Sequence, residues 1–178
     1  PQITVNREKA EIFFATQESS TAKDRYTNLI YRIHFPEVPL DWTSINLTAG
    51  KNPGILIIYT QDAKGTLLLI TTVHTCGCYL AFLPTMAMPH DAVPADWSSE
   101  RQSVYGYSLP SRLDLSTAET GDQAVFTLES ETHRISDVNI ADNSTRQSHP
   151  QKVPITVQPM LHLYALPYRN ETLSFFEM

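Results

Sequence analysis

The chain has little charge, few cysteines and no long apolar run. Its 178 residues carry 13 Lys and Arg against 19 Asp and Glu, which gives a formal net charge of −6. The basic residues form no cluster, so the electrostatic footprint of a nucleic-acid-binding protein is missing. No stretch approaches the ~20 continuous apolar residues of a transmembrane helix. We therefore expect a soluble protein with no membrane span and no nucleic-acid partner.

Cysteine is the rarest of the residue types that bind metals or act as nucleophiles. Cys76 and Cys78 are the only two, which excludes a disulfide framework. A bridge between them would close too short a loop to stabilise the fold much. The sequence also lacks Cys-x-x-Cys, His-Glu-x-x-His, Gly-x-Ser-x-Gly and Gly-x-Gly-x-x-Gly, so the common redox, zinc-protease, hydrolase and dinucleotide sites are not indicated.

The length predicts one domain that spans residues 1–178. The chain begins at Pro1 rather than at Met, so we expect a processed product or a fragment of a longer chain. A periplasmic or secreted location would follow if the N-terminus is processed.

Short apolar segments predict a mainly β fold. Residues 25–35 alternate between apolar and polar side chains, as in a half-buried strand. Residues 55–60 and 66–74 flank a loop that ends in Gly65, which predicts a hairpin. Both of its strands are apolar on both faces, so we expect this hairpin to be covered on each side. Further strands are predicted at 79–83, 103–109, 124–129, 133–140, 153–157 (at an edge, because of Pro154) and 160–166.

One helix is predicted, over Arg7–Glu18, because Ala10, Phe13 and Phe14 have helical spacing. The expected architecture is a single antiparallel sandwich or curved sheet with this short N-terminal helix. A β-rich α+β fold is the alternative.

The stretch His74-Thr75-Cys76-Gly77-Cys78 is the most unusual feature. In an extended strand, alternate side chains share a face, so His74, Cys76 and Cys78 would project to one side. Gly77 is where a bend that brings the thiols together would cost least. Three interpretations remain open for this stretch.

The first interpretation is structural, because free cysteine is among the most buried residue types. The second is a metal site for Zn or Cu, in which His74, Cys76 and Cys78 are the ligands. Weaker candidate ligands, Met86, Met88 and His90, follow in a proline-rich segment, residues 83–97, that is predicted to be a long ordered loop.

The third interpretation is thiol chemistry. His74 would lower the pKa of Cys76 and make it the candidate catalytic nucleophile, with Cys78 as a resolving thiol. A non-enzymatic alternative is a binding or structural module whose cysteines only pack in the core. Its contact surface for protein or carbohydrate would be made of tyrosines, such as Tyr105 and Tyr107, at a place remote from Cys76.

Overall fold

A computed structural model of the chain describes residues 10–35, 37–38, 49–51, 53–119, 122–130, 132–141 and 153–165. Strands dominate this part of the chain and no helix in it reaches 7 residues, so the mainly β prediction is confirmed. The strands are β1 (Glu11–Ser20), β2 (Arg25–His34), β3 (Glu37–Val38), β4 (Gly50–Lys51), β5 (Gly54–Asp62), β6 (Leu67–His74), β7 (Ala81–Pro84), β8 (Arg101–Val104), β9 (Tyr107–Pro110), β10 (Gln123–Leu128), β11 (Ile135–Ala141) and β12 (Thr156–Pro159). Two 3-10 helices are also present, η2 (His90–Ala92) and η3 (Met160–Ala165).

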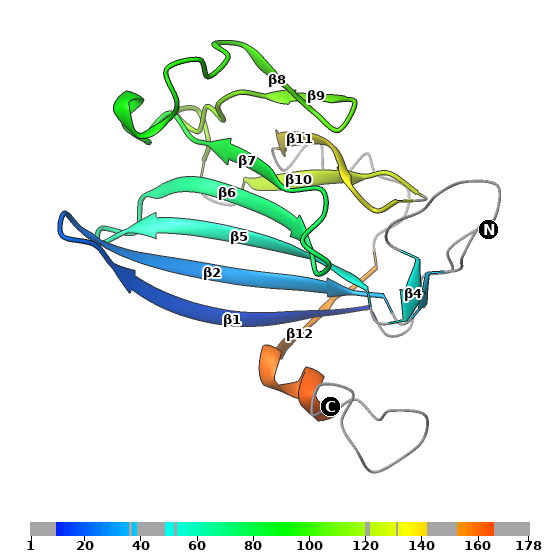
Figure 1. Cartoon of the computed structure of the whole chain (residues 1–178). Helices are drawn as coiled ribbons and strands as arrows, with labels where there is room; N and C mark the ends of the chain where they lie inside the picture. Colours follow the sequence, from blue (N-terminus) through cyan, green and yellow to red (C-terminus); the bar gives the residue numbers. More distant parts are fainter. Residues whose placement is uncertain are drawn as a thin grey trace.

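A six-stranded sheet forms the body of the molecule (Figure 1), in the order β12-β1-β2-β5-β6-β7. All neighbours are antiparallel except β12, which runs parallel to β1 with Glu11 opposite Thr156. The sheet is thus mainly antiparallel, as predicted, but mixed because of the parallel pair at this edge. A long connection separates β12 from the strands before it, so no tight turn dictates its direction. Its predicted place at a sheet edge is confirmed.

The predicted central hairpin is confirmed as β5 and β6. Asp62 closes its loop, because its carboxylate accepts hydrogen bonds from the N–H groups of Lys64 and Thr66 at 2.9 and 2.8 Å. Gly65 has a φ of +82°, the left-handed conformation for which glycine was expected there.

The core lies on one face of the sheet. Side chains of β5, β6 and β7 pack there against β9, the segment after it, and β11, and the buried apolar cluster is Ile55, Ile57, Ile70, Ala81, Leu83, Leu109, Leu113, Ile135 and Val138. On the opposite face Leu56, Ile58 and Val73 are half-buried and Phe82 is 41% exposed. The hairpin was expected to be covered on both faces. Within the described residues, it is fully covered on one face only.

The helix predicted over Arg7–Glu18 is wrong from residue 11 onward, where the chain forms β1; residues 7–9 lie outside the described part. Adjacent Phe13 and Phe14 suggested a helix, but they also suit a strand. In the strand, the two rings face opposite sides. Phe14 packs on Tyr31, with ring centroids 5.0 Å apart, while Phe13 contacts His34 on the other face. Pairing with β2 on one side and β12 on the other decides for a strand.

The strand predicted over 160–166 is also wrong, since residues 160–165 form η3 and residue 166 lies outside the described part. Leu161 and Leu163 were expected to share one face of a strand, but only one of the two is buried. Leu163 is 3% exposed and Leu161 72%. The short 3-10 helix η3 packs against β1 and buries Leu163 without a further strand partner.

Candidate functional site

The chain reverses direction at residues 74–78, which we call the cysteine turn. The N–H of His74 donates to the carbonyl of Cys78 at 3.0 Å, and the N–H of Gly77 donates to the carbonyl of His74 at 2.8 Å. Gly77 has a φ of +81°. The extended course assumed for these residues is therefore wrong beyond His74, where β6 ends. In a continued strand, Cys76 and Cys78 would have stayed in the sheet with their side chains on the face of His74. In the turn, the two cysteines lie outside the sheet.

His74 points into the protein. Its side chain is 3% exposed, and its Nε2 lies 3.1 Å from the backbone carbonyl of His133, to which it donates. Its ring also meets the edge of Tyr79 at a centroid distance of 5.1 Å. Burial lowers the pKa of His74, and the bond to His133 opposes this only in part. His74 is therefore a neutral, buried residue that its hydrogen bond to His133 holds in place.

Cys76 and Cys78 come together at the surface as free thiols. Cys76 is exposed and Cys78 half-buried, so packing in the core does not describe Cys76. A hydrogen bond with the Cys76 thiol is the main reason that the pKa of Cys78 is raised, and burial and the charge of Cys76 act in the same direction. The chain bends at Gly77, the position where the sequence made a bend cheapest, and Cys76 lies close enough to affect the titration of Cys78. The His74 imidazole is instead bonded to His133.

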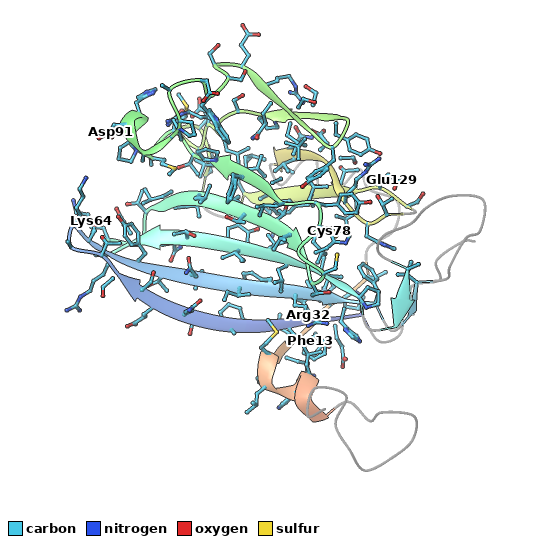
Figure 2. The ribbon with its side chains drawn as sticks, in the orientation of Figure 1. Phe13, Arg32, Lys64, Cys78, Asp91 and Glu129 are labelled. Atoms are coloured by element: carbon cyan, nitrogen blue, oxygen red, sulfur yellow. The ribbon has the colours of Figure 1, made fainter. Side chains whose placement is uncertain are left out.

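The weaker candidates Met86, Met88 and His90 lie at the other end of β6. The N–H of Thr85 donates to the carbonyl of Leu68 at 2.8 Å, which places this segment beside the start of the strand. His74 is six residues further on, roughly 20 Å along an extended strand. Figure 2 shows the same separation, with Cys78 at one end of the sheet and Asp91 at the other.

The segment that follows β7 is an ordered loop, as predicted. The Nη1 of Arg112 donates to the carbonyls of Thr85 and Met88 at 3.2 and 2.8 Å, and the indole N–H of Trp97 donates to the carbonyl of Ser111 at 2.9 Å. Met86 is 58% exposed and His90 is exposed as well. Across the described residues, no group of three or more His, Cys, Asp and Glu is placed to hold a metal ion.

Beside the cysteine turn lies a tyrosine–arginine cluster, which consists of Tyr79, Tyr105, Tyr107 and Arg134. The Arg134 guanidinium lies over the rings of Tyr107 and Tyr79, 4.7 and 5.6 Å from their centroids. Its Nη1 donates to the carbonyl of Tyr105 at 2.9 Å. The Tyr79 and Tyr105 rings meet edge to face at 5.3 Å. Tyrosines therefore gather next to the cysteines rather than away from them.

Backbone strain is concentrated at the same place. Three non-glycine residues in the described part have a positive φ, and they are Tyr79 (55°), Tyr105 (49°) and His133 (56°). Each lies outside the strands, and all three belong to the tyrosine–arginine cluster or contact it through His74. Left-handed backbone costs an ordinary residue roughly 1–2 kcal/mol, and such residues often gather at functional sites.

Sequence reasoning did not find Tyr79, His133 or Arg134 as members of a site. The single strand predicted over 103–109 is wrong, because β8 and β9 pair around a two-residue loop, Tyr105-Gly106. Gly106 was the available signal, since such loops need positive φ. The contacts of Tyr79 and Arg134 depend on residues from distant parts of the chain, so no local pattern announces them.

In its described part, the structure contains no helix long and apolar enough to cross a membrane. In comparisons with protein-family models, with curated proteins and with solved structures, nothing matches the chain.

Proposed function

We propose that the cysteine turn binds a soft metal ion, Cu(I) before Zn(II), through the thiolates of Cys76 and Cys78. The observation that supports this is a pair of free thiols in one turn, which leaves Cys76 exposed and close enough to raise the pKa of Cys78. Thiolates are soft ligands that favour Cu(I). Structural Zn(II) almost always takes four ligands, and the described residues offer no larger cluster around this pair.

His74 has a positioning role in this proposal. Its backbone N–H and carbonyl make the two hydrogen bonds that close the turn. Its imidazole would have to leave the His133 carbonyl, at 3.1 Å, before it could bind a metal. The two thiols each lose a proton on metal binding, so the ion must displace the proton that Cys76 helps Cys78 to retain.

A competition titration tests the proposal. Reduced protein is titrated with Cu(I) without oxygen against the chelator bicinchoninate, and separately with Zn(II). We expect about one Cu(I) per chain, and an affinity at least roughly tenfold lower in Cys76→Ser and in Cys78→Ser, because each removes a soft ligand. The double variant Met86→Leu with His90→Ala is the matched control and should bind as the wild type does. Cu(I) binding that survives both serine substitutions would refute the proposal.

The same pair of thiols, Cys76 and Cys78, favours a second candidate function, thiol–disulfide exchange. Cys76, the exposed thiol, would attack glutathione disulfide, and Cys78 would then displace the bound glutathione. The two thiols lose two protons and two electrons, and two molecules of glutathione are released. Mass spectrometry of protein equilibrated with oxidised and reduced glutathione measures the bridged fraction. A pair that stays reduced at an excess of glutathione disulfide would exclude this candidate and leave the metal proposal standing.

A further inference from the structure

Tyr105 occupies a position that a tyrosine does not favour. It is the first residue of the two-residue loop between β8 and β9, with a φ of 49°, and Gly106 follows with a φ of 89°. Positive φ at both loop positions is the type I′ arrangement, in which Asn, Asp and Gly are preferred. Tyr105 nevertheless places its ring at the hairpin tip, where it is 51% exposed.

The exposed ring is held in a fixed position. Tyr79 supports it edge to face at 5.3 Å, and Arg134 ties down its carbonyl at 2.9 Å. Arg134 is itself fixed between Tyr79 and Tyr107. A ring that is already ordered loses little side-chain entropy when a ligand covers it, so this surface is preorganised for a contact.

The neighbourhood of Tyr105 defines the chemistry of its ligand. Within the described residues of β8–β9 and β10–β11, Tyr105 is the one large apolar side chain that is exposed. Leu80, the residue after Tyr79, is 39% exposed, so an apolar peptide would meet one aliphatic anchor next to the cluster in the sequence and none on these hairpins. Arg134 supplies one positive charge, and Glu129, whose backbone N–H donates to the carbonyl of Arg134 at 2.9 Å, supplies a negative one nearby. The local balance does not favour a strongly anionic ligand.

We infer that the tyrosine–arginine cluster is a binding site for a neutral saccharide. The C–H face of one sugar ring would lie on the Tyr105 ring. The phenol hydroxyls and the guanidinium edge of Arg134 are the hydrogen-bonding groups for its hydroxyls. The saccharide contacts involve neither thiol, so binding is expected to be independent of the exposed Cys76.

Calorimetric titration with cellohexaose, xylohexaose, chitohexaose, maltohexaose and mannohexaose tests the inference, with a heparin hexasaccharide as the anionic comparison. At least one neutral hexasaccharide should bind more tightly than the heparin fragment. Tyr105→Asn should weaken that binding roughly tenfold or more, because it removes the ring. The same substitution should keep or raise the melting temperature, since Asn suits the left-handed position.

Three variants separate the alternatives. Tyr105→Phe keeps the ring and should retain most of the binding, while Phe82→Asn removes an exposed ring outside the cluster and should have no effect. Cys76→Ser should bind the saccharide as the wild type does, so failure of the metal proposal leaves this result unchanged. No binding to any neutral hexasaccharide, stronger binding to heparin, or full binding by Tyr105→Asn would each overturn the inference.

Discussion

At the scale of the residue, Thr72 carries a hydroxyl that costs stability. Its side chain is fully buried, and its Oγ1 has no hydrogen-bond partner among the described residues. Thr72→Val keeps the shape and removes the unsatisfied group, so we expect a gain of about 1 kcal/mol in the free energy of unfolding. Thermal unfolding should show a melting temperature higher by about 2–4 °C. A lower melting temperature would mean that the hydroxyl has a partner after all.

His74 and His133 make stability depend on pH. Burial lowers the pKa of each, and for His133 the neighbouring His74 adds to the effect while Glu129 opposes it. Below the ordinary histidine pKa of 6.5 the unfolded chain binds protons that the folded chain refuses. Stability from this pair is therefore complete above about pH 6.5 and is lost progressively as the pH falls below it.

Urea unfolding at about pH 7.5 and 5.5 measures this loss, in a range above the titration of the carboxylates. His133→Asn is the test variant, because Asn tolerates the left-handed backbone of position 133 and its carbonyl can still accept from His74. The difference between the two urea midpoints should become smaller in this variant. An unchanged difference would assign the pH dependence to other groups.

At the scale of the element, two glycines have different reasons to be glycine. A Cβ on Gly54 would lie 2.7 Å from the carbonyl oxygen of Ile33 in the neighbouring strand, whereas one on Gly65 would meet nothing within 4 Å. Gly54→Ala should therefore cost about 3 kcal/mol, because the clash is with backbone. Gly65→Ala should cost about 1 kcal/mol through its positive φ alone.

Asparagine substitutions separate these two causes. Gly65→Asn should restore nearly the stability of the wild type, because Asn tolerates positive φ, while Gly54→Asn should be no better than Gly54→Ala. Chemical denaturation gives the four free energies. Equal costs at both positions would contradict the steric account of Gly54.

The sequence predicts those elements whose cause is local. The β5–β6 hairpin follows from two apolar runs and Gly65, all within 21 residues. No helical spacing in these residues competes with the strand pattern. The β1 strand does not, because Phe13 and Phe14 fit a helix until β2 and β12 are present. The cysteine turn is partly predictable from the sequence. Gly77 marks where a bend costs least, but the burial of His74 depends on His133, 59 positions away.

At the scale of the whole molecule, the hairpins β8–β9 and β10–β11 share their core with the large sheet. Ile135 of β11 is 5% exposed and belongs to the same apolar cluster as Ile55 and Leu83. Ile135→Ala should cost about 2–4 kcal/mol, and sheet and hairpins should still unfold together. Far-ultraviolet dichroism and tryptophan fluorescence should then give coincident transitions at a lower denaturant concentration.

Leu161→Ala is the matched control, because Leu161 is 72% exposed and its loss should change stability by no more than about 0.5 kcal/mol. Two separated transitions in Ile135→Ala would mean that the hairpins form an independent unit, contrary to a single domain spanning the chain.

The parallel pairing of β12 with β1 has a consequence for folding on the ribosome. Residues 11–14 leave the ribosome long before their partners in this pairing, residues 156–159. The antiparallel neighbours of β2, β5 and β6 are all available much earlier. Until residues 156–159 have been made, the outer edge of β1 stays unpaired and open to strands of other nascent chains. Completion of the sheet at this edge is then a late step with a long loop to close.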